Sequence, residues 1–126
     1  FISQGADIIM PVAGPVGLGT ASVAEGTDTK LIWVDSDGYE TTEYGDIILT
    51  SVLKHMGPAV HGAIEETVAG SFSNEPYVGT LENGGVSLAE FHDFESEVPQ
   101  ELKDKLAEYE EQIISGDLVI ESPNSP

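Results

Sequence analysis

The stretch GADIIMPVAGPVGLG, residues Gly5–Gly19, decides how the chain is organised. Gly5 is typical of a residue that ends a helix, because glycine adopts the left-handed conformation without strain. The apolar run from Ile8 to Val12 is typical of a strand that is covered on both faces. The small residues that follow predict a tight turn into a helix, the junction at which α/β proteins hold ligands. A tight connection that binds nothing has the same sequence, so both interpretations stay open.

The charge of the chain excludes whole classes of function. Its 126 residues carry 23 acidic side chains against four basic ones, a formal net charge of -19. Nucleic-acid binding is excluded, because phosphate contacts need clustered Lys and Arg, and an anionic membrane surface repels the chain. A hydrophobic fraction of 40% nevertheless indicates one folded domain. The acidic surplus is typical of a halophilic protein, in which salt screens the repulsion. An acidic surface kept for solubility is the other explanation.

The chain contains no cysteine, which removes disulfides, thiolate metal sites and a cysteine nucleophile. No apolar run approaches the roughly 20 residues that cross a bilayer. The opening residues, FISQG, look like the last turn of a helix that begins earlier. We therefore expect the chain to be a piece cut from a longer protein.

Apolar runs alternate with helical patterns along the chain, which predicts an α/β fold with a mainly parallel sheet and right-handed crossovers. Strands are predicted at 8–12, 30–34, 47–53, 77–81 and 117–120, with a short extended piece at 86–89 and a polar loop up to Asp46. Helices are predicted over 16–25, from Pro58 to Gly70 and from Pro99 to Gly116. Spacings of three and four place Val16, Thr20 and Val23 on one face of the first helix, and the small Ala21 and Ala24 allow it to pack close to a sheet. On the second helix, the spacing of Val60, Ile64 and Val68 predicts a buried stripe.

Candidate ligand-binding residues follow three successive predicted strands, at their carboxyl ends. In an open parallel sheet those ends share one edge, so the three sets are expected to converge there. Backbone N–H groups of the turn donate hydrogen bonds, a carboxylate accepts two from the paired hydroxyls of a sugar, and a lysine donates or balances the carboxylate. The alternatives are turn formation by the acids and a solvated cation. The candidates are Gly14, Pro15, Val16 and Gly17, then Asp35 and Asp37, then Lys54.

No catalytic set, metal site or cofactor motif is predicted. The run from Asp35 to Gly38 resembles the start of a calcium loop, but its glycine is fourth rather than sixth and Asp46 replaces the glutamate at position twelve. The three histidines show no metal spacing. The patterns of a nucleophile elbow, a Walker loop and a dinucleotide-binding turn are absent from the sequence.

Five segments, in order, resemble the basic membrane protein family of solute-binding lipoproteins, which includes purine nucleoside receptors of ABC transporters. The resemblance covers Gly5 to Ile120. Its segments are GADIIMPVAGPVGLG, WVDSDGY, ILTSVLKHM, GGVSLAEF and VPQELKDKLAEYEEQIISGDL.

The resemblance implies a two-lobed type I periplasmic-binding fold that closes around a nucleoside and delivers it to a membrane permease. Residues 1–126 then form the carboxyl-terminal lobe, a three-layer Rossmann-like unit, and 82–96 form the segment that crosses the hinge. The glycine turn and one of Asp35 and Asp37 would hold the ribose, with Lys54 near the ligand. The full-length protein would be lipid-anchored on the extracellular face of the membrane, and an exposed hinge face would allow the fragment to dimerise. A Rossmann-like nucleotide-using enzyme domain and a regulatory lobe without ligand are the alternatives.

Overall fold

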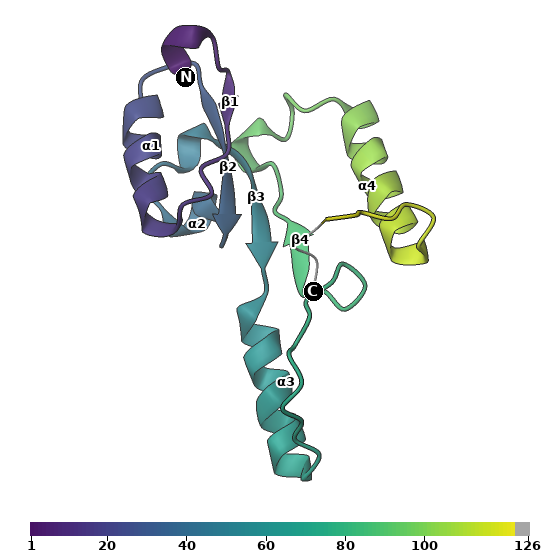
Figure 1. Ribbon diagram of the computed structural model, residues 1–126. Coiled ribbons are helices and arrows are strands. Elements are labelled where there is room, and N and C mark those ends of the chain that lie inside the picture. The colour runs from purple at the N-terminus through teal and green to yellow at the C-terminus, as the bar shows by residue number, and fades with distance from the viewer. Residues whose placement is uncertain (123–126) are drawn as a thin grey trace. The chain divides into compact units, whose positions relative to one another are not determined.

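The computed structural model describes residues 1–122 and divides them into two compact units (Figure 1). The first unit contains Phe1–Lys54 and Ser87–Glu97. The second contains His55–Val86 and the described residues from Val98 onward. The unit boundaries therefore cut the chain three times. The elements are β1 (Ile8–Ile9), α1 (Gly17–Ala24), β2 (Lys30–Asp35), α2 (Gly38–Thr41), β3 (Ile48–Lys54), α3 (Met56–Ala69), β4 (Val86–Leu88) and α4 (Gln100–Ser115).

The sheet has the strand order β1-β2-β3-β4, and β1 with β2 and β2 with β3 run parallel, which confirms the α/β class. β1 contains two residues rather than the five predicted. Pro11 shortly after it has no N–H group to give to a ladder. Ile8 is 48% exposed, so this strand is not covered on both faces in the described chain.

A bulge interrupts the pairing of β2 with β3. Leu31 pairs with Ile48 and Ile32 pairs with Thr50, which leaves Leu49 without a partner in β2. Because one extra residue reverses the alternation of side chains along a strand, Ile48 and Ser51 both reach the same helix. The Ser51 hydroxyl accepts a hydrogen bond from the Gly38 N–H at 3.0 Å.

The core lies between β2, β3 and α1 and is built on small residues. Figure 1 shows α1 and α2 on one side of β2. The buried face of α1 consists of Gly17, Ala21 and Ala24, whereas Val16 and Val23 are 75% and 70% exposed. The close packing predicted from Ala21 and Ala24 is therefore confirmed, whereas the face of Val16 and Val23 is exposed. Small side chains let the helix approach the sheet closely: a Cβ on Gly17 would lie 3.2 Å from the Trp33 ring.

The region predicted as a polar loop contains the four-residue helix α2 and a 3₁₀ turn at Gly45–Ile47. Asp37 is the N-cap of α2, because its carboxylate accepts a hydrogen bond from the Tyr39 N–H at 3.1 Å. A capped turn of helix therefore replaces the loop, and it packs against the first unit's core: Gly38 is buried.

In the second unit, α3 and α4 end as predicted at Gly70 and Gly116, which have φ of 74° and 81°. The stripe of α3, in contrast, is exposed: Val60 is 60%, Ile64 57% and Val68 84% accessible. No other part of residues 1–122 buries this face. The periodic pattern therefore predicted the helix correctly but not the exposure of its apolar face.

Two predicted strands are absent from the described part of the chain. At 77–81 the Asn83 amide takes the backbone bonds, accepting from the Thr80 N–H and donating to the Val78 carbonyl. After α4, the Leu118 N–H donates back to the Gln112 carbonyl at 2.9 Å. Both segments therefore form these hydrogen bonds with residues close in sequence and not with a neighbouring strand. The extended piece at 86–89 is present as β4. No helix among residues 1–122 combines the length and apolar character needed to span a membrane.

Candidate functional site

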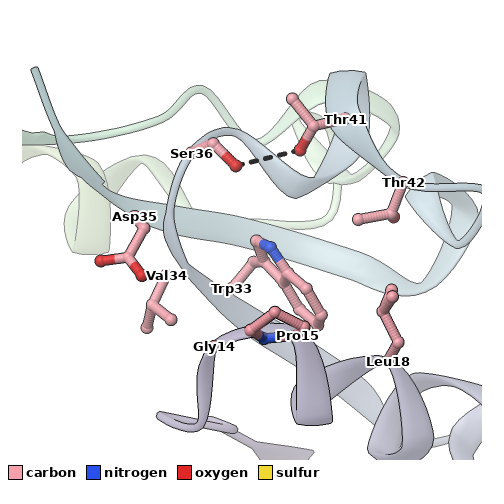
Figure 2. Close-up of a pocket in the computed structure, with 9 residues that line it drawn as sticks. All are labelled: Gly14, Pro15, Leu18, Trp33, Val34, Asp35, Ser36, Thr41 and Thr42. Carbon is pink, nitrogen blue, oxygen red and sulfur yellow. Dashed lines mark hydrogen bonds between the residues drawn. The ribbon is translucent and has the colours of Figure 1, made fainter. Parts of the chain in front are cut away.

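A cavity of about 340 Å³ lies in the first unit, at the carboxyl end of β2. The 3₁₀ turn Gly14–Val16 forms one side of it and α2 with its following residue forms another. Figure 2 shows the Trp33 indole between these two sides. The lining residues are Gly14, Pro15, Leu18, Trp33, Val34, Asp35, Ser36, Thr41 and Thr42.

Asp35 stands at the rim of this cavity in an unusual backbone conformation. Its φ is 73°, and the Ser36 N–H donates to the Val34 carbonyl at 3.0 Å, which closes a three-residue turn around it. A γ-turn with positive φ is rare and strained for a residue with a side chain. Such strain persists where the surrounding structure enforces it, and it gathers at ligand sites.

Lys54 ends β3 and reaches the same rim. Its Nζ lies 2.7 Å from Asp35 Oδ1. The two side chains are 64% and 44% exposed, so water screens the pair and its contribution to stability is small. The lysine therefore contacts one of the two carboxylate oxygens of Asp35.

The hydroxyl groups that line the cavity donate their hydrogen bonds to other groups of the protein. Thr41 donates to the Asp37 carbonyl at 2.6 Å and Thr42 donates to the Gly38 carbonyl at 2.7 Å. The Ser36 and Thr41 hydroxyl oxygens are 3.1 Å apart, and because the Thr41 hydrogen is used, Ser36 donates there (Figure 2). These side chains therefore offer lone pairs, so the wall suits a ligand that brings its own donors.

The structure brings together some of the residues predicted from sequence. Gly14, Pro15 and Asp35 line one cavity, and Lys54 contacts Asp35. The other three lie elsewhere. Val16 lines a separate apolar hollow of about 780 Å³, Gly17 is buried against Trp33, and Asp37 is turned toward α2 and His92.

Several lining residues were not predicted from sequence. The sequence predicts Trp33 as part of a buried strand and Thr41 and Thr42 as part of a polar loop. The signal for Trp33 was its position two residues before Asp35, which places it on the same edge of the sheet. No comparable signal marks the threonines, because α2 had no apolar periodicity to reveal it.

Comparison with known proteins assigns the family. Residues 1–122 match the sequence profile of the Bmp family, described as ABC transporter substrate-binding protein PnrA-like. The chain belongs to this family. No curated protein sequence matches it significantly.

Solved structures show the same fold at low identity. A solute-binding protein of an ABC transporter system from Aeropyrum pernix K1 matches 98% of the chain with a TM-score of 0.79 and 20% identity. A transcriptional activator of the comK gene from Bacillus halodurans matches 95% with a TM-score of 0.80 and 18% identity. A solute-binding protein from Conexibacter woesei DSM 14684 matches 95% with a TM-score of 0.62 and 21% identity.

The chain covers only part of each of these structures, namely 42%, 41% and 39% of their lengths. At such identities the likeness concerns the fold. The family assignment rests instead on the profile match over residues 1–122.

Proposed function

We propose that the chain is the carboxyl-terminal lobe of a two-lobed receptor that binds a purine nucleoside between its lobes and delivers it to an ABC permease. One observation carries this proposal: Gly14 and Asp35, 21 positions apart, line the same cavity, and Lys54 holds Asp35 from the next strand. Open parallel sheets bind ligands at this edge. The receptor is lipid-anchored on the extracellular face of the membrane.

The hydrogen-bond pattern supports the sugar of the nucleoside as the part held here. The Asp35 carboxylate and the Ser36 hydroxyl oxygen are acceptors among the lining residues, and a ribose diol supplies two donors. An anion finds no free hydroxyl hydrogen on Ser36, Thr41 or Thr42 and meets a chain of net charge -19. Trp33 and Leu18 add apolar contact area to the same cavity.

The division into units supports the proposed hinge. The segment 82–96 contains the boundary between Val86 and Ser87, and a further boundary falls next to it, at Glu97 and Val98. We infer that this segment crosses between the lobes of the complete receptor. The 126-residue chain supplies half of the ligand site, and the other lobe supplies the rest.

Isothermal titration of the full-length receptor with inosine, guanosine and adenosine tests this function. We expect micromolar or tighter binding with the nucleoside unchanged afterwards, and far weaker binding of inosine 5′-monophosphate. The isolated 126-residue chain is the matched control and should give little or no heat, because its cleft is incomplete. Hydrolysis or phosphorolysis of the nucleoside would indicate the enzyme alternative instead. The absence of heat with all three nucleosides would contradict the proposed ligand.

A further inference from the structure

A cluster of polar side chains lies beside the cavity, on α2 and on the 3₁₀ turn His92–Phe94 of the first unit. Asp37 is at its centre. Its Oδ1 accepts from the Tyr39 N–H at 3.1 Å and from the Ser51 hydroxyl at 3.3 Å, and its Oδ2 lies 2.7 Å from His92 Nε2. The side chains of His92 and Asp37 are only 16% and 22% exposed, so this contact is largely shielded from water.

The 3₁₀ turn His92–Phe94 contacts α2 at a second point, Tyr39. The rings of Tyr39 and His92 stack with centroids 4.1 Å apart and planes 8° from parallel. The Tyr39 hydroxyl donates to Asp93 Oδ1 at 3.2 Å. His92 has a φ of 44°, which is uncommon for a residue with a side chain. Two adjacent residues of the turn therefore fix the beginning of α2.

Helix α2 depends on such external contacts. It contains four residues, Gly38–Thr41, and a helix of one turn is not stable by itself in water. It supplies Thr41 to the cavity wall, and Thr42 follows directly. Its first residue packs on the cavity floor: a Cβ on Gly38 would lie 2.6 Å from Trp33 Cγ. Any shift of the cap thus moves the wall and uncovers the indole.

We propose that His92 and Asp37 form a positioning pair that holds the threonine wall of the ligand cavity in place. His92 acts through Asp37 and lines no part of the cavity itself. The proposal concerns the site of the proposed function and rests on it for the ligand measurements below, but its structural readout needs no ligand.

The fluorescence of Trp33, the single tryptophan of the chain, reports on the position of the threonine wall formed by Thr41 and Thr42. Trp33 is 8% exposed and lies under α2. In the 126-residue chain, His92→Ala should shift the tryptophan emission to longer wavelength and increase quenching by acrylamide, while far-ultraviolet circular dichroism shows a folded protein. His92→Gln, which keeps a side-chain donor for Asp37, should restore most of the wild-type spectrum. The matched control is His61→Ala, because His61 is exposed on α3, in the other unit, with its Nδ1 3.4 Å from Glu65 Oε2. Unchanged emission and quenching in both His92 variants would overturn the proposal.

A double-mutant cycle in the full-length receptor tests the link to ligand binding. Serine caps a helix as well as aspartate does but is too short to reach His92, so Asp37→Ser separates the cap from the pair. We expect His92→Ala and Asp37→Ser each to weaken inosine binding about tenfold, and the double variant to bind no worse than either. Additive losses would overturn the proposal, because they would indicate that Asp37 contacts the ligand directly. A wild-type receptor that binds no nucleoside would overturn the proposed function and leave the tryptophan readout to decide the role of His92.

Discussion

Lys54 Nζ and Asp35 Oδ1 are joined by a 2.7 Å contact between the carboxyl ends of β3 and β2. The strands are parallel neighbours, and Asp35 pairs in register with Leu53, the residue before the lysine. The contact therefore follows from the topology rather than from proximity in sequence. Because both side chains are well exposed, the pair orients the carboxylate at the cavity rim more than it stabilises the fold.

The strained turn at Asp35 predicts opposite effects on stability and on binding. Asp35→Gly should raise the free energy of unfolding by up to about 1 kcal/mol, because glycine adopts a φ of 73° without strain. The same change should weaken nucleoside binding by the full-length receptor, because the carboxylate is lost. Urea denaturation and calorimetric titration measure the two effects. Asp46→Gly is the control: Asp46 is exposed and has no positive φ, so that change should lower stability. A clear destabilisation by Asp35→Gly would contradict the strain argument.

The contact of Gly38 with the core predicts that alanine is not tolerated there. A Cβ at this position would lie 2.6 Å from Trp33 Cγ and 2.7 Å from Ile48 Cδ1, so Gly38→Ala should cost about 1–3 kcal/mol of unfolding free energy. Gly19→Ala provides the comparison within the same unit, since nothing lies within 4 Å of its Cβ position in α1. That change should stabilise by up to about 1 kcal/mol through helix propensity. Equal effects of the two substitutions in urea denaturation would show that α2 does not pack as described.

The features that were predicted from sequence depend on local chemistry. Gly70 and Gly116 mark helix ends because the left-handed conformation at a helix end favours glycine, whatever the helix packs against. The placement of Asp35 and Lys54 at one edge followed from the order of apolar runs alone.

The features that were missed depend on contacts distant in sequence. The bulge at Leu49 has no sequence cue, yet it turns Ser51 toward Gly38 and so fixes where α2 sits. The role of Asp37 is decided by His92, which lies 55 residues away. Periodicity gave the helix α3 but not the exposure of Ile64, because a pattern of apolar residues does not say what covers them.

The environment of Tyr39 predicts an altered titration. The charge of Asp93 and its hydrogen bond to the phenol raise the pKa of Tyr39 above its ordinary value of 10.0. The folded state then keeps the proton that the unfolded state loses, so this contribution to stability is complete below pH 10 and is lost as pH rises further. Absorbance at 295 nm follows the ionisation of the tyrosines, and Asp93→Asn should move the Tyr39 step to lower pH. Glu97→Gln, which leaves the hydrogen bond between Tyr39 and Asp93 in place, should not move it. Identical titration curves for the wild type and Asp93→Asn would contradict the contact.

The acidic surplus predicts that salt stabilises the chain. With a net charge of -19, self-repulsion opposes the compact state. The Debye length falls from about 10 Å at 0.1 M to about 3 Å at 1 M, so KCl should raise the melting temperature over that range. Replacing three exposed glutamates of α4, Glu101, Glu110 and Glu111, with glutamine removes charge without touching the core and should flatten the rise. The triple variant should also melt higher than the wild type at low salt. If the wild-type melting temperature does not depend on KCl, the acidic surface serves solubility alone and not adaptation to high ionic strength.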